Sequence, residues 1–200
     1  LNFVGEKSVD DTKKWFWLKN LPFILATKVI VPTNEFKNLL LKKKIKANLK
    51  VIPHIVNTIP FINDNLSINP NKPILIYAKQ MKDYAGHSYL LKIFKRIQKI
   101  IPNAELWFTS DGPERKTLEK KTVNYNLKNV KFFGIVPDNI LVDLVKKANI
   151  LVHPTKYESF GIILVEAMQA GLPVVAFNIG GIPDVVKNTK NGYMNFNVAI

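Results

Sequence analysis

The sequence predicts an α/β protein with a Rossmann-like, doubly wound parallel sheet that is incomplete at both ends. Two observations carry this prediction. Short apolar runs alternate with helical segments from Pro73 onward. The helical segments, such as 87–101, carry apolar residues three and four positions apart, which is typical of helices that bury one face. Strands that alternate with helices of this length form parallel sheets covered on both faces.

The elements can be assigned in order along the chain. The expected strands are 74–78, 104–109, 130–133, 150–152 and 173–176, with another near Tyr193. The expected helices are 87–101, 113–126, 138–148, 160–170 and 182–186. Pro113 is expected in the first turn of its helix, where proline is favoured. Ligands of such sheets bind beyond the carboxyl ends of the strands. The loops after Ala78, Thr109, Phe133, Val152 and Phe177 are therefore the candidate binding loops.

The first fifty residues follow a different pattern. A helix containing Trp15, Phe16 and Trp17 is expected to precede a strand, a lysine-rich helix and a second strand. These three elements are expected at 28–31, 35–44 and 50–52. The segment 64–72 is polar, rich in asparagine and bounded by prolines, which indicates a linker. We therefore expect a domain boundary there or slightly earlier.

Composition excludes several classes of site. The chain has no cysteine, so disulfides, zinc–thiolate sites and thiol nucleophiles are impossible. Three scattered histidines make a metal site unexpected. No apolar run approaches the roughly 18 residues of a membrane-spanning helix. With 29 basic and 15 acidic residues, the net charge is +14. This favours an anionic partner, while a lysine-rich surface that only contacts solvent is the alternative.

The segment from His153 to Pro173 is the most distinctive in the chain. Ser159 is expected to cap a helix that Gly171 and Pro173 end. The free N–H groups at that helix start would face the ligand crevice and suit a diphosphate. Glu158 precedes the helix, and Glu166 lies inside its apolar sequence, where a carboxylate needs a partner. Spacing alone leaves open that both carboxylates are only surface charges.

Six motifs in order resemble those of glycosyltransferase family 4, the group 1 transferases of the GT-B fold. Glu158 and Glu166 resemble its Glu-x7-Glu pair, and Val51-Ile-Pro-His-Ile-Val-Asn-Thr58 resembles its domain-junction motif. The other four are the segments 111–115, 132–137, 171–176 and 180–186. The resemblance implies three regions: the end of an amino-terminal Rossmann-like domain (1–52), an interdomain linker (53–72) and a truncated nucleotide-sugar-binding domain (73–200).

The resemblance also implies roles for individual residues. Glu158 would contact the hydroxyls of the donor sugar as the catalytic carboxylate, and Glu166 would contact the ribose. The remaining implied contacts are sugar and phosphate at Phe160, Gly161 and Ile162, the base at Ile135 and Val136, and the nucleotide at Asp111 and Gly112. The donor would be a nucleoside-diphosphate (NDP) sugar. No cofactor and no metal are expected, and the transfer of a hexose would retain the anomeric configuration.

One motif departs from the family pattern. The family supplies an arginine and a lysine to the diphosphate, and these positions are Gln80 and Ala85 here. Lys79 and Lys82 lie beside them and are the candidate replacements. Glutamine donates a hydrogen bond but does not neutralise charge. Three alternatives follow: an active transferase that uses Lys79 or Lys82, a non-catalytic nucleotide-sugar-binding subunit, and a degenerate or truncated product. We also expect the 200-residue chain alone to bind donor without transferring sugar.

The expected partners are the donor, a glycan or lipid-linked acceptor and an anionic membrane surface. The membrane hypothesis rests on the aromatic segment at 13–23 and on Lys42, Lys43, Lys44 and Lys46. The alternative is that the aromatic rings pack inside the amino-terminal domain. Nucleic acid is not an expected partner, because the basic residues are dispersed and no recognition helix is evident. We expect a cytoplasmic protein, peripheral at the inner membrane face.

Overall fold

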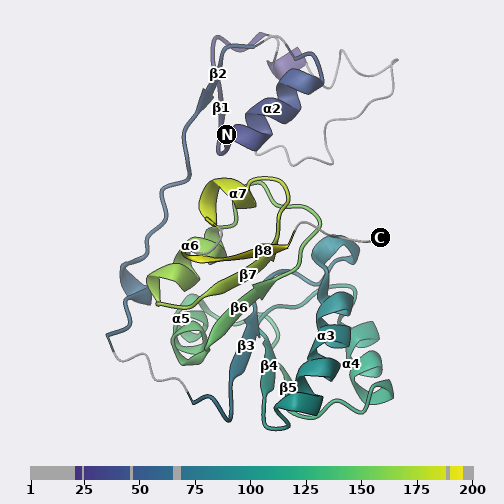
Figure 1. The fold of residues 1–200 in the computed structure, drawn as a ribbon. Coiled ribbons are helices and arrows are strands. Elements are labelled where there is room, and N and C mark those ends of the chain that lie inside the picture. Colours follow the sequence, from purple (N-terminus) through teal and green to yellow (C-terminus); the bar gives the residue numbers. More distant parts are fainter. Residues whose placement is uncertain (1–20, 24, 46, 65–68, 188–189, 196–200) are drawn as a thin grey trace.

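The computed structural model describes residues 21–23, 25–45, 47–64, 69–187 and 190–195. Its main feature is a six-stranded sheet with the strand order β5-β4-β3-β6-β7-β8, in which every pairing is parallel (Figure 1). The strands are β3 (Ile74–Tyr77), β4 (Glu105–Phe108), β5 (Val130–Phe132), β6 (Ile150–His153), β7 (Val174–Phe177) and β8 (Gly192–Asn195). The predicted α/β class and doubly wound sheet are confirmed.

Helices cover both faces of this sheet. They are α3 (His87–Ile100), α4 (Arg115–Asn124), α5 (Asp138–Lys147), α6 (Ile162–Gln169) and α7 (Ile182–Val185). Alternate residues of a strand point to opposite faces, so β3 serves two cores. Tyr77 packs in the core beneath α3 and α4, and Ile76 in the core beneath α5 and α6. After β5 the chain crosses back to β6, on the other side of β3. As a result, α5 and α6 lie on the opposite face of the sheet from α3 and α4 (Figure 1).

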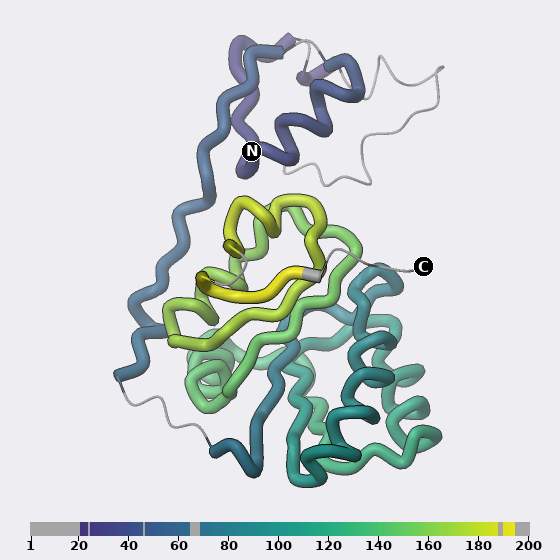
Figure 2. Tube along the Cα trace, viewed as in Figure 1, coloured from purple at the N-terminus to yellow at the C-terminus, as the bar shows by residue number. Residues whose placement is uncertain are grey.

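A smaller unit precedes the six-stranded sheet. It consists of β1 (Val29–Val31), α2 (Asn34–Lys42) and β2 (Leu49–Val51), and the two strands pair in parallel. Its core holds Phe36 and Leu40. From β2 the chain runs along one side of the molecule toward the larger sheet (Figure 2). The aromatic helix expected near Trp15 lies outside the described residues.

The amino end of α2 contacts the larger unit. Thr33 caps α2 by accepting from the Phe36 N–H, and its hydroxyl also donates to the Ser159 carbonyl at 3.2 Å. The Asn34 N–H donates to a carboxylate oxygen of Asp184 at 2.5 Å. These two hydrogen bonds connect the amino-terminal unit to the loop before α6 and to α7.

Two expected helix starts are wrong. Ser159 does not cap α6, because Gly161 holds the cap position with a left-handed φ of 87° and the helix begins at Ile162. Pro113 lies before α4 and not in its first turn, since Glu114 is the cap. There the Glu114 N–H donates to the Met81 carbonyl, which holds the loop in a non-helical position. Among the described helices, none is long and apolar enough to cross a bilayer.

Candidate functional site

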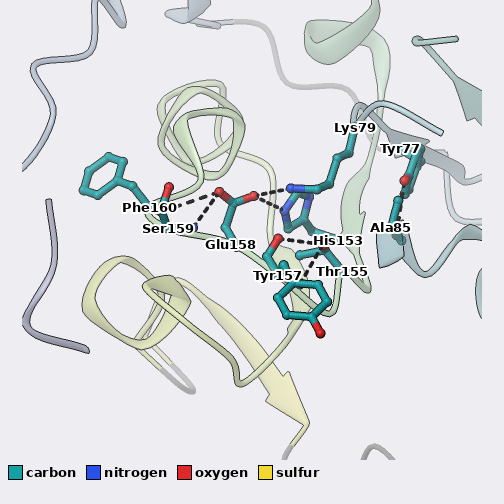
Figure 3. Close-up of polar contacts among 9 residues, drawn as sticks. All are labelled: Tyr77, Lys79, Ala85, His153, Thr155, Tyr157, Glu158, Ser159 and Phe160. Carbon is teal, nitrogen blue, oxygen red and sulfur yellow. Dashed lines mark hydrogen bonds and ion pairs between the residues drawn. The ribbon is translucent and has the colours of Figure 1, made fainter. Parts of the chain in front are cut away.

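Polar residues from several loops meet at the carboxyl edge of the sheet. Lys79 follows β3, Ser110 follows β4, and Glu158 follows β6. The Ser110 hydroxyl donates to the Lys79 carbonyl, which fixes the backbone of the loop after β3. Lys79 in turn reaches across to Glu158 (Figure 3). Residues 79 positions apart in sequence therefore share one site, because parallel strands end at the same edge.

Both oxygens of the Glu158 carboxylate are hydrogen-bonded. Oε2 accepts from Lys79 Nζ at 2.7 Å and from His153 Nε2 at 3.0 Å. Oε1 accepts from the backbone N–H of Ser159 at 3.1 Å and that of Phe160 at 3.5 Å. The side chains of Lys79 and Glu158 are only 18% and 14% exposed, so water screens this ion pair weakly. A charged cluster is thus already assembled at the edge.

The electrostatic effect on Glu158 is large. Burial alone would raise the pKa of Glu158. The hydrogen bond from His153 and the positive charge of Lys79 outweigh this effect and lower the pKa to about 2. Glu158 is therefore ionised at neutral pH and acts only as an acceptor. His153 must then donate from Nε2, which leaves Nδ1 as an acceptor without a partner among the described residues. Burial lowers the pKa of His153, which keeps its ring neutral.

Sequence reasoning missed His153. The residue is the last of β6 and is 1% exposed, and its Nε2 holds one oxygen of Glu158. A histidine at the carboxyl end of a buried strand, five positions before a candidate carboxylate, was the available signal. The role of His153 depends on how the loop after β6 turns back and brings Glu158 against it, and the sequence pattern alone does not give this path.

The glycine pair after β7 fits closely against the Glu158 loop. The Gly181 N–H donates to the Glu158 carbonyl at 2.8 Å. A Cβ atom at Gly180, whose φ is +54°, would lie 2.0 Å from that same carbonyl oxygen. Only glycine allows this approach together with this backbone conformation. The motif at 180–186 therefore positions the Glu158 backbone from the neighbouring strand.

Glu166 lies in the middle of α6 and is half-buried. Burial raises the pKa of its carboxyl group, and the nearby charge of Asp138 raises it further. Within the described part of the chain, this carboxylate has neither a hydrogen bond nor an ion pair. The partner that the sequence argument required is thus not supplied by those residues.

The other candidate residues separate into two groups. Gln80 and Ile135 are exposed, Ile135 to 85%, and Ile162 and Lys82 also have accessible surface. Phe160 is buried, with its ring edge against His54 from the expected linker. Some of the residues predicted to contact the donor are therefore accessible to a ligand, whereas the Phe160 side chain is buried within the protein.

Three candidates serve the protein's own packing. Val136 packs against the core beneath α5 and α6. Asp111 accepts from Arg115 at 3.0 Å and from the Gly112 N–H at 2.7 Å. A Cβ at Gly112 would meet the backbone of Met81 at 2.5 Å. Asp111 and Gly112 therefore hold the turn after β4 against the loop after β3.

The two positions that lack the expected cations differ in their surroundings. Gln80 is exposed, so its side chain has room to change. Ala85 is fully buried, and its carbonyl accepts from the Tyr77 hydroxyl at 3.1 Å. A lysine at position 85 would therefore not fit this packing. No cluster of acidic and histidine side chains suited to a metal ion occurs among the described residues.

A parallel sheet covered by helices on both faces, with charged residues gathered at its carboxyl edge, defines the class as a doubly wound α/β domain, in which ligands bind at that edge. The chain belongs to a particular family within that class. The family described as "Glycosyl transferases group 1" matches residues 58–197.

Among curated proteins, the sulfoquinovosyl transferase SQD2 of Arabidopsis thaliana is 31% identical over 127 residues, 64% of this chain and 24% of its own length. The phosphatidylinositol N-acetylglucosaminyltransferase GPI3 subunit of Saccharomyces cerevisiae is 24% identical over 212 residues, 96% of this chain and 47% of its own length. This chain therefore spans about a quarter to a half of these relatives.

Solved structures agree on the fold. Sucrose-phosphate synthase from Thermosynechococcus elongatus is similar with a TM-score of 0.79 and 25% identity, over 96% of this chain and 50% of that one. HepE of Anabaena, solved with UDP and glucose, is similar with a TM-score of 0.76 and 22% identity, over 88% of this chain and 51% of that one. The expected GT-B fold is confirmed.

Proposed function

We propose that the intact protein transfers a hexose from an NDP-sugar to a glycan or lipid-linked acceptor. The observation that carries this proposal is the Lys79–Glu158 pair, a cation and a carboxylate 2.7 Å apart at the carboxyl edge of the sheet. The family match places this pair in a glycosyltransferase chain. Gln80 and Ala85 do not supply the two cations that the family uses at the diphosphate. An active transferase therefore needs another cation at this edge, and Lys79 is that cation in our proposal.

The proposed division of labour follows from the chemistry of the groups. Lys79 leaves Glu158 and contacts the diphosphate, while Glu158 accepts from sugar hydroxyls. Glu166, which has no partner among the described residues, accepts from the ribose hydroxyls. Accessible Ile135 contacts the base, and Gln80 and Lys82 are placed to contact phosphate. In this scheme Val136, Asp111 and Gly112 support the site through packing rather than through direct contact.

In the proposed transfer, an acceptor hydroxyl oxygen forms the new bond to the anomeric carbon, and the bond from that carbon to the phosphate oxygen breaks. The acceptor proton passes to the departing nucleoside diphosphate, on which negative charge develops. Lys79 and the amino end of α6, with Gly161 and Ile162, would stabilise that charge. We propose that the reaction retains the anomeric configuration and uses no metal, as in glycosyltransferase family 4. The donor is then a substrate, and no cofactor takes part.

The alternative is a non-catalytic subunit that binds an NDP-sugar. The uncharged Gln80 and the buried Ala85 favour it, because both remove charge-assisted contacts to phosphate. Assays of transfer and of donor hydrolysis with the intact protein separate the two functions. The transferase proposal predicts turnover that Lys79→Met reduces far more than Lys82→Met. Binding without transfer or hydrolysis from any NDP-sugar would establish the alternative.

We further propose a lipid-linked acceptor and a peripheral position at the cytoplasmic membrane face. The relative from Saccharomyces cerevisiae is named as a phosphatidylinositol N-acetylglucosaminyltransferase subunit, and this name includes a lipid. Assays of the intact protein with water-soluble and with bilayer-embedded acceptors would test this. Transfer only to soluble glycans would contradict it.

A further inference from the structure

The two helical layers that flank the main sheet differ sharply in charge. Helix α3 carries four basic and no acidic residues, and α4 carries four basic residues and one glutamate, which gives +7 together. On the opposite layer, α5 carries two lysines and two aspartates and α6 one glutamate, which gives −1. Half of the net charge of +14 therefore lies on one layer of one domain.

The cations of α3 share one side of that helix. Lys92, Lys95, Arg96 and Lys99 recur every three or four residues and are all exposed. Leu90, Leu91 and Phe94 lie on the opposite side in the core. Within the described residues, no acidic side chain pairs with these four cations. Their charge is thus directed outward without internal compensation.

Helix α4 extends the same surface. It packs beside α3, and Lys121 donates to Ser88 of α3 at 3.0 Å (Figure 1). Lys116 and Lys120 of α4 are exposed, as is Lys128 just beyond the helix. We call the surface formed by these cations of α3, α4 and Lys128 the cationic face.

The cationic face also exposes aliphatic side chains and a hollow. Ile93 and Ile100, seven residues apart, line one edge of α3, and Ile100 is 82% exposed. Val123 of α4 is 73% exposed. Between the carboxyl ends of the two helices lies a hollow of about 300 Å³. Its lining includes Lys95, Lys99, Lys128 and Tyr125.

We propose that the cationic face docks on an anionic lipid bilayer. Lysine and arginine near such a surface are attracted by the negative headgroups. Exposed aliphatic side chains among the cations can enter the region between headgroups and acyl chains. The hollow, with three lysines and an aromatic ring, suits one lipid phosphate. A bilayer is favoured over nucleic acid because the most exposed apolar side chains among the cations, Ile93, Ile100 and Val123, are aliphatic, whereas base stacking needs exposed rings. The one ring in the hollow, Tyr125, is half-buried and already lies beneath Lys95.

This inference rests on the proposed membrane position and names the surface that would mediate it, but it does not depend on the donor site and is tested without any sugar nucleotide. The intact protein is sedimented with phosphatidylcholine vesicles and with vesicles that also contain about 30% phosphatidylglycerol. Binding is expected only to the anionic vesicles and should fall steeply with salt. The double variant Lys92→Glu/Arg96→Glu should reduce partitioning about tenfold or more, because each cation contributes independently.

The matched control is Lys146→Glu/Lys147→Glu on α5, which makes the same change in net charge on the opposite layer. It should retain most of the binding, and thermal melts of both variants should show that the fold is kept. Equal losses in the two variants would show attraction by net charge alone and overturn the proposal. Unchanged binding in Lys92→Glu/Arg96→Glu would also overturn it and transfer the role to the amino-terminal lysines. Retention on duplex DNA without binding to anionic vesicles would establish a nucleic-acid partner instead.

Discussion

Replacing Lys79 with methionine tests the charged cluster at the edge of the sheet. The partners of Glu158 hold its pKa at about 2 instead of 4.5. At 1.36 kcal/mol per pKa unit, this corresponds to about 3 kcal/mol of net stabilisation of the carboxylate. His153 and two backbone N–H groups remain in the variant, so we assign Lys79 about 1–2 kcal/mol of this. The free energy of unfolding at pH 7 should fall by that amount.

For a chain of this size, such a loss lowers the melting temperature by about 2–8 °C. Differential scanning calorimetry of Lys79→Met, with Lys82→Met as the control, measures it. Because the folded pKa of Glu158 is depressed, its stabilisation is present above about pH 4.5 and is lost as the pH falls toward 2. The difference between wild type and Lys79→Met should therefore shrink in acid. Equal melting temperatures at pH 7 would refute the reasoning.

Three further substitutions test other parts of the structure. Glu166→Gln should leave the free energy of unfolding at pH 7 equal or slightly higher, because burial and Asp138 raise the pKa of the Glu166 carboxyl group and so disfavour its charge. The affinity for NDP-sugar should fall in calorimetric titration, and a clear loss of stability would indicate a structural role instead. Gly180→Ala should destabilise the protein by about 2 kcal/mol or more in urea unfolding, since its Cβ would lie 2.0 Å from a carbonyl oxygen, and a neutral effect would contradict the described loop. Glu105 has a pKa of about 2 because bonds from Lys131, Lys72 and Trp107 outweigh its burial. Glu105→Gln should lower the free energy of unfolding at pH 7 by about 1–2 kcal/mol, a range reduced because Lys72 and Lys131 are exposed. The variant should also lose less stability than the wild type between pH 4.5 and 2, and an unchanged pH profile would count against the cluster.

Much of the fold followed from periodicity, because a parallel sheet covered on both faces needs continuous apolar strands. The six strands appear where the apolar runs predicted them, within one or two residues. Helix starts were less certain. Ser159 has the right chemistry for a cap, but its carbonyl bonds to Thr33, and the left-handed Gly161 delays the helix. The position of Ser159 therefore depends partly on a hydrogen bond from Thr33, which lies 126 positions away in the sequence.

The site was predicted only in part for a similar reason. Strand order brings Lys79 and Glu158 to one edge, and the sequence indicated both. The sequence did not indicate that Lys79 and Glu158 form an ion pair, nor that His153 hydrogen-bonds to the same carboxylate oxygen. Val136 was predicted to line the base, and the structure shows it half-buried against the core beneath α5 and α6. The sequence of this loop does not indicate which of its apolar side chains turns inward.

The central claim is that the carboxyl edge around Glu158 binds an NDP-sugar. Isothermal titration calorimetry of the intact protein against UDP-, GDP- and ADP-sugars tests it most directly, with Glu158→Gln as the variant and Asp143→Asn, at an exposed position of α5, as the surface control. We predict that one nucleotide class binds and that Glu158→Gln weakens it about 10- to 100-fold, as expected for lost hydrogen bonds to a charged acceptor. Asp143→Asn should bind like the wild type. Binding of no NDP-sugar, or equal affinity in Glu158→Gln, would contradict the claim.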